Sequence, residues 1–339
     1  MELRYAVADE PFSGEFLIIA NQLRTAKNGR SYLAMRIGDG TGELPVKIWD
    51  ADVELFNSLE AGRVIALQNI RPRLFNHQIQ LEWNGRDREL FRVLPEAETD
   101  YQKFLPQSPS DLNQCWDFLA EVIVTIDDPV LQMVLSYFFS NPDFKAAFIR
   151  VPAALKRHHA YIGGLLEHTA GVTAICKAAA EYYPLVKRDL LLTGAILHDI
   201  GKVKTYQITK GFDGTTEGKL IGHLVLGVEM VEEAFANLNK GYERGELHNR
   251  LIHLLVSHHG IMEWGSPVEP LTLEACILHH ADNLDAQVTK YLTVMRSEVQ
   301  PAEWSAFDPG LGRSLFLGSA VEPEEESSTM APESSSGLE

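Results

Sequence analysis

Histidine and aspartate residues in the second half of this sequence have the types and spacing of metal ligands. Of the twelve histidines, eleven lie between residues 158 and 280. A single histidine on a helix is usually a core or surface residue, but here several lie in apolar stretches at helical spacing, together with aspartates. Imidazole and carboxylate without thiolate suit Mn, Fe, Zn, Ni or Co better than Ca or Mg alone. The candidate ligands are His168, His198, Asp199, His223, His258, His259 and Asp282.

The adjacent pair His198 and Asp199 is the centre of this set. The largely apolar stretch 190–197 leads into the pair, so we expect Asp199 to be buried, where an uncompensated charge is costly. Neighbouring residues on a helix point about 100° apart. The pair could therefore hold one ion from two sides, or Asp199 could bridge two ions. A structural His–Asp hydrogen bond would explain this pair but not the other candidate ligands.

Two ions that share Asp199 would support a two-metal hydroxide mechanism, because bound water loses a proton near neutral pH. Such a nucleophile would hydrolyse a phosphodiester or phosphomonoester. We expect Asp199, Lys202 and His158 to be catalytic. Lys202 could stabilise charge on phosphate oxygens. Arg157, His158 and His159 could contact the substrate phosphate, or His158 could donate a proton to the leaving oxygen. A plain surface role stays open for these residues. His279 and His280 flank Asp282, and one of them could bond to a ligand.

The elements that carry these residues are predicted to be helices. From residue 109 to about 310, apolar residues recur at spacings of three and four. Several stretches begin with a capping residue: Ser110 or Asp111, Asp127 or Asp128, and Asn141. Helices that hold the candidate ligands are expected at about 163–183, 188–200, 222–238, 245–259 and 271–295. A hairpin-like segment near 205–220 interrupts them. This pattern predicts a helical metal-dependent phosphohydrolase domain over 109–310.

Residues 12–95 instead alternate in the manner of strands. Five short strands, with one helix between the third and the fourth, are the order of an OB-fold barrel; an SH3-like barrel is the alternative. Residues 96–108 lack periodicity and predict a linker. Residues 321–339 carry six Glu and no Lys or Arg, which predicts a disordered acidic tail. The expected fold class is multidomain α+β, with an OB-fold followed by an all-α helical bundle.

An OB-fold could bind a single strand through aromatic stacking and a few cations. Trp49 and Phe75 could equally be core residues of a small barrel. Arg71 and Arg73, at i and i+2, are expected on one strand face, where they could contact phosphates. The candidate nucleic-acid-binding residues of the barrel are Tyr32, Lys47, Trp49, Arg71, Arg73, Phe75 and His77.

Overall composition excludes several classes of protein. The formal net charge is 30 − 47 = −17, which argues against a protein that coats nucleic acid electrostatically, although residues 11–95 are close to neutral. No apolar run approaches the ~18 residues needed to span a bilayer, and the N-terminus does not resemble a signal peptide. Three widely spaced cysteines indicate reduced thiols. We therefore expect a cytoplasmic protein.

The spacing H…HD…D at His168, His198–Asp199 and Asp282 resembles that of the HD-domain phosphohydrolase superfamily, and the further histidines resemble the additional ligands of its dinuclear members. The segments LLTGAILHDIGK, SHHGIMEWGSP and LHHADNLDA, together with the predicted barrel, are similar to those of YhaM-type 3′→5′ exoribonucleases. This resemblance implies removal of nucleotides from the 3′ end of single-stranded RNA, release of 5′-mononucleotides, and two divalent ions, with manganese favoured.

Other functions stay open. The partner would be single-stranded RNA, with single-stranded DNA as an alternative substrate, and a homo-oligomer is not excluded. A second enzyme hypothesis is hydrolysis of a small nucleotide or cyclic dinucleotide, but the segments IGKVKTY and IMEWGSP lack the proline-bearing and GYP sequences of the cyclic-dinucleotide group. A non-enzymatic hypothesis is a nucleic-acid-binding regulator with a degenerate metal site. It is disfavoured because every expected ligand is present.

Overall fold

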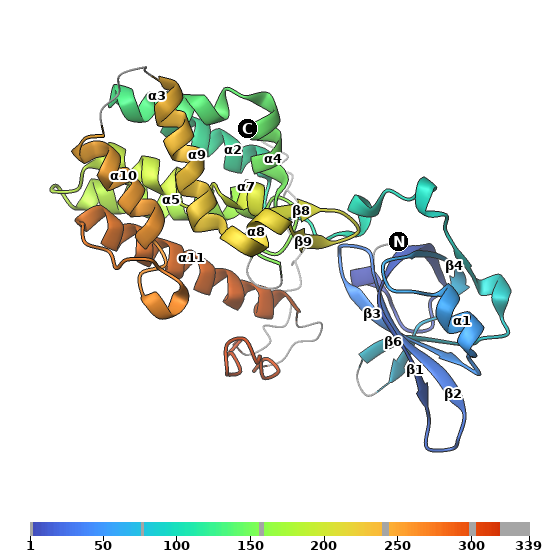
Figure 1. The fold of residues 1–339 in the computed structure, drawn as a ribbon. Coiled ribbons are helices and arrows are strands. Elements are labelled where there is room, and N and C mark those ends of the chain that lie inside the picture. The colour runs from blue at the N-terminus through green and yellow to red at the C-terminus, as the bar shows by residue number, and fades with distance from the viewer. Residues whose placement is uncertain (1–2, 76–77, 156–158, 239–243, 298–302, 319–339) are drawn as a thin grey trace, which may run out of the picture. The chain divides into compact units, whose positions relative to one another are not determined.

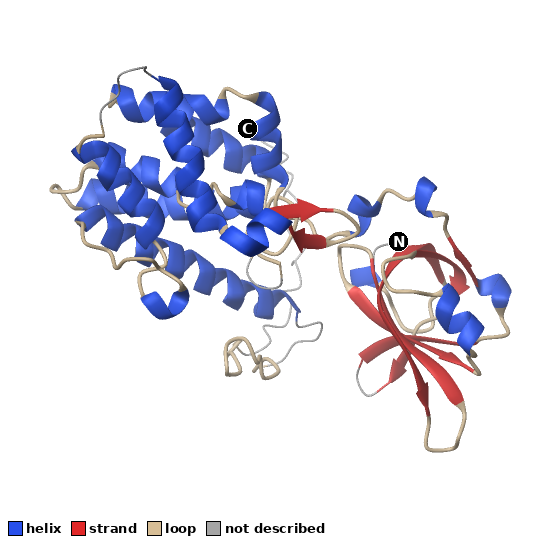
Figure 2. Cartoon of the chain, in the orientation of Figure 1, coloured by secondary structure: helices blue, strands red, loops and turns tan. Residues whose placement is uncertain are grey.

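The computed structural model describes residues 3–75, 78–155, 159–238, 244–297 and 303–318. Figures 1 and 2 show that strands make up most of the N-terminal part and helices most of the rest, apart from one small hairpin. The N-terminal elements are β1 (Phe12–Thr25), β2 (Ser31–Gly38), β3 (Glu43–Trp49), α1 (Val53–Ser58), β4 (Val64–Ile70), β5 (Arg73–Phe75), β6 (Gln78–Asn84) and β7 (Phe91–Val93).

The strand order of this sheet confirms the predicted OB-fold. The hydrogen-bonded order is β5-β6-β3-β2-β1-β4-β7, and β3 and β6 pair in parallel. Only Arg71 and Pro72 separate β4, which pairs with β1, from β5, which pairs with β6. β4 and β5 therefore act as one bent strand, which is the predicted fourth strand, and β6 is the predicted fifth. The ladder is interrupted at this bend, where Pro72 has no N–H to donate.

The barrel core follows from the alternation of side chains along each strand. In β2, Leu33, Met35 and Ile37 are buried, whereas the alternate residue Arg36 is exposed. This pattern leaves one face of β2 for the core and the other for solvent. α1 lies between β3 and β4, as predicted, and the carboxylate of Asp52 accepts the backbone N–H of Leu55 at its start. β7, a strand of three residues, was not predicted.

The helical part begins after residue 111. Asp111, Asp128 and Asn141 each accept backbone N–H groups at a helix start, as their sequence positions predicted. The elements are α2 (Leu112–Val124), α3 (Pro129–Phe139), α4 (Pro142–Arg150), α5 (Gly164–Tyr182), α6 (Arg188–Leu197), α7 (Lys202–Thr205), β8 (Tyr206–Ile208), β9 (Phe212–Gly214), α8 (Thr216–Ile221), α9 (His223–Leu238), α10 (Glu246–Ser257) and α11 (Leu273–Ser297).

α6 is the central helix of this part. All residues from Leu190 to Leu197 are buried, and α6 packs against both α5 and α10. A helix that is apolar on every side belongs inside a domain. A Cβ at Gly194 would lie 2.4 Å from Cδ1 of Leu254, so glycine lets α6 and α10 approach closely. α6 therefore lies in the middle of the helical core. No helix of the described residues is long and apolar enough to cross a membrane.

Candidate metal centre and nucleic-acid surface

The seven predicted ligands converge on one point of the helical part. They come from α5, the turn after α6, the start of α9, the turn after α10, and α11. Five segments that are far apart in the sequence thus contribute one or two side chains each. The ligands are His168, His198, Asp199, His223, His258, His259 and Asp282.

Four of these residues form what we call the first group: His168, His198, Asp199 and Asp282. The Nε2 atom of His168 lies 3.2 Å from Nε2 of His198, 3.4 Å from Oδ2 of Asp199 and 3.2 Å from Oδ1 of Asp282. Nε2 of His198 lies 3.4 Å from the same Oδ2. Two imidazoles and two carboxylates that face a common point are a suitable ligand set for a divalent transition metal.

The second group consists of Asp199, His223, His258 and His259. The other carboxylate oxygen of Asp199, Oδ1, lies 3.4 Å from Nε2 of His223 and 3.7 Å from Nε2 of His258. Nε2 of His259 lies 3.3 Å from that of His223. Asp199 belongs to both groups, with one oxygen in each. Its Oδ1 is buried and has no hydrogen-bond partner among the described residues, as an oxygen reserved for a metal ion would be.

Three histidines are held so that Nε2 faces the centre. Nδ1 of His198 donates to the carbonyl of Ala195 at 2.8 Å, and Nδ1 of His258 donates to that of Leu255 at 2.8 Å. Nδ1 of His259 lies 3.0 Å from the carbonyl of Trp264. A neutral imidazole that donates from Nδ1 has a lone pair on Nε2, which is the form that binds a metal.

The electrostatics of the two groups differ. Burial lowers the pKa of His223 to about 3, and burial together with the nearby His258 lowers the pKa of His259 to about 4. Both imidazoles are thus neutral at neutral pH. Burial also opposes the charge on His168, but Asp199, Asp282 and a further carboxylate raise its pKa well above the ordinary value. The first group therefore favours positive charge, which a divalent ion would supply.

Lys202 faces the centre, as predicted. It is buried, and its ammonium group forms an ion pair with Oδ2 of Asp199. Burial alone would lower the pKa of Lys202, but the charge of Asp199 outweighs it and raises the pKa. The lysine lies one turn after Asp199 because the chain forms α7 there. A positive side chain is thus held beside the metal centre.

The sequence predicted no role for Asp285, and His159, expected as a possible contact of the substrate phosphate, is instead buried and hydrogen-bonded to Asp285. Oδ2 of Asp285 lies 2.7 Å from Nδ1 of His168 and 2.8 Å from Nε2 of His159. The i+3 spacing from Asp282, which puts both aspartates on one face of α11, was the available signal. His279 was a candidate for a bond to a ligand side chain; its Nδ1 instead donates to the backbone carbonyl of His258 at 2.9 Å. Arg157, His158 and His77 lie outside the described residues.

The centre is open to solvent on one side. His168, His198, Asp199 and His258 are buried, whereas His223 and His259 are partly exposed. The turn after His259 carries Met262 and Trp264, which are 64% and 55% exposed. The side chains of His223 and Asp282 are each 19% exposed, so solvent reaches a member of both groups.

On the barrel, three predicted nucleic-acid-binding residues form a cluster on β2 and β3. The rings of Tyr32 and Trp49 lie 5.3 Å apart, and Nζ of Lys47 lies 4.9 Å and 4.7 Å from their centres. The ring of Phe75 is 5.9 Å from the same Nζ. Trp49 is partly exposed and Phe75 is 55% exposed, so neither is a core side chain. Tyr32 and Lys47 also line a groove of about 480 Å³ on the β1–β3 face.

Arg71 and Arg73 do not share a strand. β5 begins at Arg73, and Arg71 lies in the bend before it, where its guanidinium donates to the carbonyl of Asp9 at 2.9 Å. The expectation of one common strand face overlooked the effect of Pro72, which ends the ladder between them. Both arginines are exposed, but only Arg73 extends from a strand next to the aromatic Phe75.

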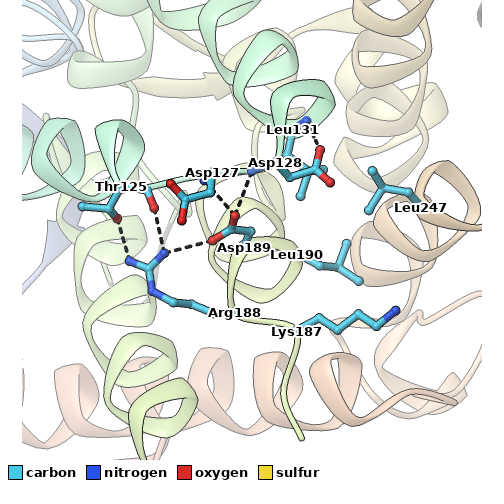
Figure 3. Close-up of a pocket in the computed structure, with 9 residues that line it drawn as sticks. All are labelled: Thr125, Asp127, Asp128, Leu131, Lys187, Arg188, Asp189, Leu190 and Leu247. Carbon is cyan, nitrogen blue, oxygen red and sulfur yellow. Dashed lines mark hydrogen bonds and ion pairs between the residues drawn. The ribbon is translucent and has the colours of Figure 1, made fainter. Parts of the chain in front are cut away.

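A separate hollow of about 530 Å³ lies near the start of α6 (Figure 3). Two polar side chains that line it bond to the backbone of the turn between α2 and α3. Oδ2 of Asp189 accepts the backbone N–H groups of Asp127 and Asp128 at 2.8 Å and 2.9 Å, and Arg188 donates to the carbonyl of Thr125 at 2.9 Å. These bonds fix the turn between α2 and α3 against α6, so the hollow is a structural junction.

Comparison with known proteins agrees with this geometry. The HD domain family model matches residues 165–287. The chain is 31% identical over 304 residues to the 3′-5′ exoribonuclease YhaM of Oceanobacillus iheyensis. This match covers 89% of this chain and 92% of the relative. It is also 31% identical over 296 residues to the protein of that name from Bacillus subtilis. This match covers 86% of this chain and 90% of that relative.

Two solved structures are similar to the chain in part. Schizosaccharomyces pombe Pot1pC bound to ssDNA matches 29% of this chain and 88% of its own, at 12% identity and a TM-score of 0.25. The OB domain of Ta0387 from Thermoplasma acidophilum matches 28% of this chain and 85% of its own, at 15% identity and a TM-score of 0.22. Similarities this weak carry no argument about function. The sequence similarity over nearly the whole length, by contrast, shows that the chain belongs to the YhaM family of 3′-5′ exoribonucleases.

Proposed function

We propose that this protein removes nucleotides from the 3′ end of single-stranded RNA and releases 5′-mononucleotides, using two divalent ions. The arrangement of Asp199 carries this proposal, because its two oxygens face two different sets of histidines. The names of the full-length relatives support RNA as the substrate and 3′ to 5′ as the direction. Single-stranded DNA is the alternative substrate.

The residues present fit two divalent transition-metal ions, with manganese proposed as the native one. The first group offers two imidazoles and two carboxylates, and the second offers three imidazoles and the shared carboxylate. A thiolate ligand would favour zinc over manganese, and neither group contains one. Two ions held there would supply a water of lowered pKa and neutralise charge on the phosphate.

The chain's own residues would then orient the scissile phosphate. Lys202 is close enough to Asp199 to reach a phosphate oxygen beside the centre, where a buried cation stabilises developing negative charge. The partly exposed side of the second group would admit the 3′ end. The net charge of −17 does not oppose this, because the contacts to the phosphates would be local.

The barrel would hold the rest of the strand. Tyr32, Trp49 and Phe75 offer rings around Lys47, a combination that binds single strands without reading their sequence. Arg73 would add a phosphate contact. We propose the same domain limits as from sequence: the binding barrel over 12–95, a linker over 96–108, the phosphohydrolase domain over 109–310 and an acidic tail over 321–339.

The decisive test is a time course on 5′-labelled single-stranded RNA with Mn²⁺, resolved by length. A ladder that shortens progressively from the 3′ end, with 5′-mononucleotide as the product, supports the proposal. Uncleaved RNA together with turnover of a cyclic dinucleotide or another small nucleotide would support the rival enzyme instead. RNA that is bound but never cleaved under any divalent metal would support a regulator.

A further inference from the structure

We propose that Asp285 is a positioning residue: held in turn by His159 and Tyr161, it orients His168 and sets how tightly the first group binds its divalent ion. The inference rests on the proposed metal centre and goes beyond its ligands. It assigns a role to three side chains that do not themselves face the ions. None of the three belongs to the seven ligands that the sequence pattern singled out.

The hydrogen bonds of this network run in one direction. Oδ2 of Asp285 accepts from Nδ1 of His168 at 2.7 Å and from Nε2 of His159 at 2.8 Å. A histidine that donates from Nε2 can accept on Nδ1, and the hydroxyl of Tyr161 lies 2.8 Å from Nδ1 of His159. The chain therefore runs from Tyr161 through His159 to Asp285. With an ion on Nε2, His168 carries its proton on Nδ1, which is the atom that meets Asp285.

His168 differs from the other histidines in its partner. Nδ1 of His198 and of His258 donates to a backbone carbonyl of its own helix, and Nδ1 of His259 to that of Trp264. Nδ1 of His168 instead meets a carboxylate. A charged acceptor makes the imidazole a stronger ligand than a neutral carbonyl does, and partners of this kind change metal affinity by 10- to 100-fold. The first group should therefore bind its ion more tightly because of Asp285.

The backbone is shaped to bring His159 to this position. His159 has a φ of 53°, in the left-handed region that non-glycine residues seldom adopt, and its side chain is 2% exposed. Its carbonyl accepts the N–H of Ala153 at 3.1 Å. A Cβ at Gly164 would lie 2.0 Å from that carbonyl oxygen, so glycine is needed there. Unfavourable backbone conformations persist where the surrounding structure fixes them, and they cluster at functional sites.

α5 leaves room for the carboxylate of Asp285. A Cβ at Gly171, one turn after His168, would lie 2.2 Å from Oδ1 of Asp285. Glycine inside a helix costs about 1 kcal/mol relative to alanine. Glycine thus stands at a helix position where any larger residue would displace the carboxylate of Asp285, which His168 bonds to. The variant Gly171→Ala should therefore move this carboxylate without removing it.

Together His159, His168 and Asp285 could themselves be mistaken for a metal site, since their ligand atoms lie within 4.8 Å of one another. Their contacts of 2.7 Å and 2.8 Å are hydrogen-bond distances, and an ion between the three would have to separate them. In addition, Nε2 of His168 already faces Asp199 and Asp282. Donor and acceptor roles account for both hydrogen bonds of Asp285 to these histidines.

The test is a titration of the metal-free, full-length protein with Mn²⁺, in which the free ion is counted by electron paramagnetic resonance and no RNA is present. The variants are Asp285→Asn and Gly171→Ala. The matched control is His248→Gln, because His248 is as buried as His159 and lies 3.2 Å from the carboxylate of Glu232, which is not one of the candidate ligands. The melting temperature of each metal-free variant is measured in parallel.

We expect two bound ions in the parent protein. In both test variants the affinity of one ion should fall by about 10- to 100-fold while the other is kept, and His248→Gln should keep both. Gly171→Ala should do this without lowering the metal-free melting temperature, because alanine favours the helix. Tyr161→Phe should give a smaller effect in the same direction.

Three results would overturn the inference. Test variants that bind both ions like the parent would show that Asp285 does not act on His168. A loss of both ions together with a lower metal-free melting temperature in both variants would show a merely structural role. Three ions per chain would make Asp285 a ligand. A parent protein that binds no ion would instead refute the metal centre of the proposed function, and this inference with it.

Discussion

Oδ2 of Asp199 lies 3.4 Å from Nε2 of its neighbour in sequence, His198. Adjacent side chains on a helix diverge by about 100°, so the two reach a common point from different directions. His198 follows the last residue of α6 and keeps helical backbone angles, and Asp199 lies in the turn before α7. A helix whose residues 190–197 are all buried thus places two candidate ligands side by side at its end.

Replacing Asp199 with Asn is the most direct test of the shared carboxylate. Asn keeps the size of the side chain but loses the charge that both groups use. We expect metal content, measured by mass spectrometry of dialysed protein, to fall from two ions per chain to fewer than one. kcat/KM on RNA should fall by about 10³-fold or more, as when one member of a catalytic constellation is removed. Retained cleavage would place the centre elsewhere.

Much of the fold could be predicted from sequence because each part depends on local patterns. Strand alternation and the helix between the third and fourth strands predicted the barrel, and capping residues such as Asp111 marked helix starts. The helix predicted at 188–200 in fact ends at Leu197, because the ligand pair that follows it occupies a turn. Such ends depend on tertiary contacts, which the periodicity of one segment does not contain.

The candidate metal ligands could also be chosen from sequence, since each is a histidine or an aspartate in or beside an apolar stretch. Asp285 has only the weak signal of its i+3 spacing from Asp282, and its contact with His168 is what gives it a role. His159 could be chosen only as a possible contact of the substrate phosphate, because its left-handed backbone and its bond to Asp285 have no sequence signal. The bend at Pro72 was missed because alternation continues across it, and this placed Arg71 on a strand that it does not join.

Metal removal should destabilise the helical part. Positive ions would offset the buried carboxylates of the two groups, and an ion at 100 times its Kd contributes about 2.7 kcal/mol. We expect Mn²⁺ to raise the melting temperature of chelator-treated protein by several degrees, measured by calorimetry. Asp199→Asn serves as the control and should show no rise. A rise of equal size in that variant would mean that Mn²⁺ acts at another site.

Tyr32→Ala should weaken RNA capture and leave the chemistry intact. The ring lies beside Trp49 and Lys47 on the barrel, and stacking contributes roughly 1–3 kcal/mol per base. KM for single-stranded RNA should rise by about 5- to 100-fold, whereas hydrolysis of a small phosphodiester should be unchanged. The control is Tyr182→Ala, a tyrosine 78% exposed at the end of α5. An unchanged KM in Tyr32→Ala would refute a binding role for this cluster.

A buried carboxylate far from the proposed chemistry gives a prediction about pH and stability. Glu274, 1% exposed at the start of α11, accepts the backbone N–H of Lys187 at 2.8 Å and the guanidinium of Arg250 at 2.7 Å. Burial would raise its pKa, but these bonds outweigh burial and lower it. Because the folded pKa is below the unfolded one, the stabilisation is complete above about pH 4.5 and is lost as the pH falls through the folded pKa.

Glu274→Gln should therefore lower the free energy of unfolding by about 1–3 kcal/mol at pH 7, as expected for hydrogen bonds to a charged group. The difference from the parent protein should be the same at pH 8 and should shrink below pH 4.5. Urea denaturation in the presence of a chelator measures it, since the chelator removes the separate effect of pH on metal binding. If the difference stayed constant from pH 7 to pH 3.5, side-chain packing and not the charge of Glu274 would be the cause.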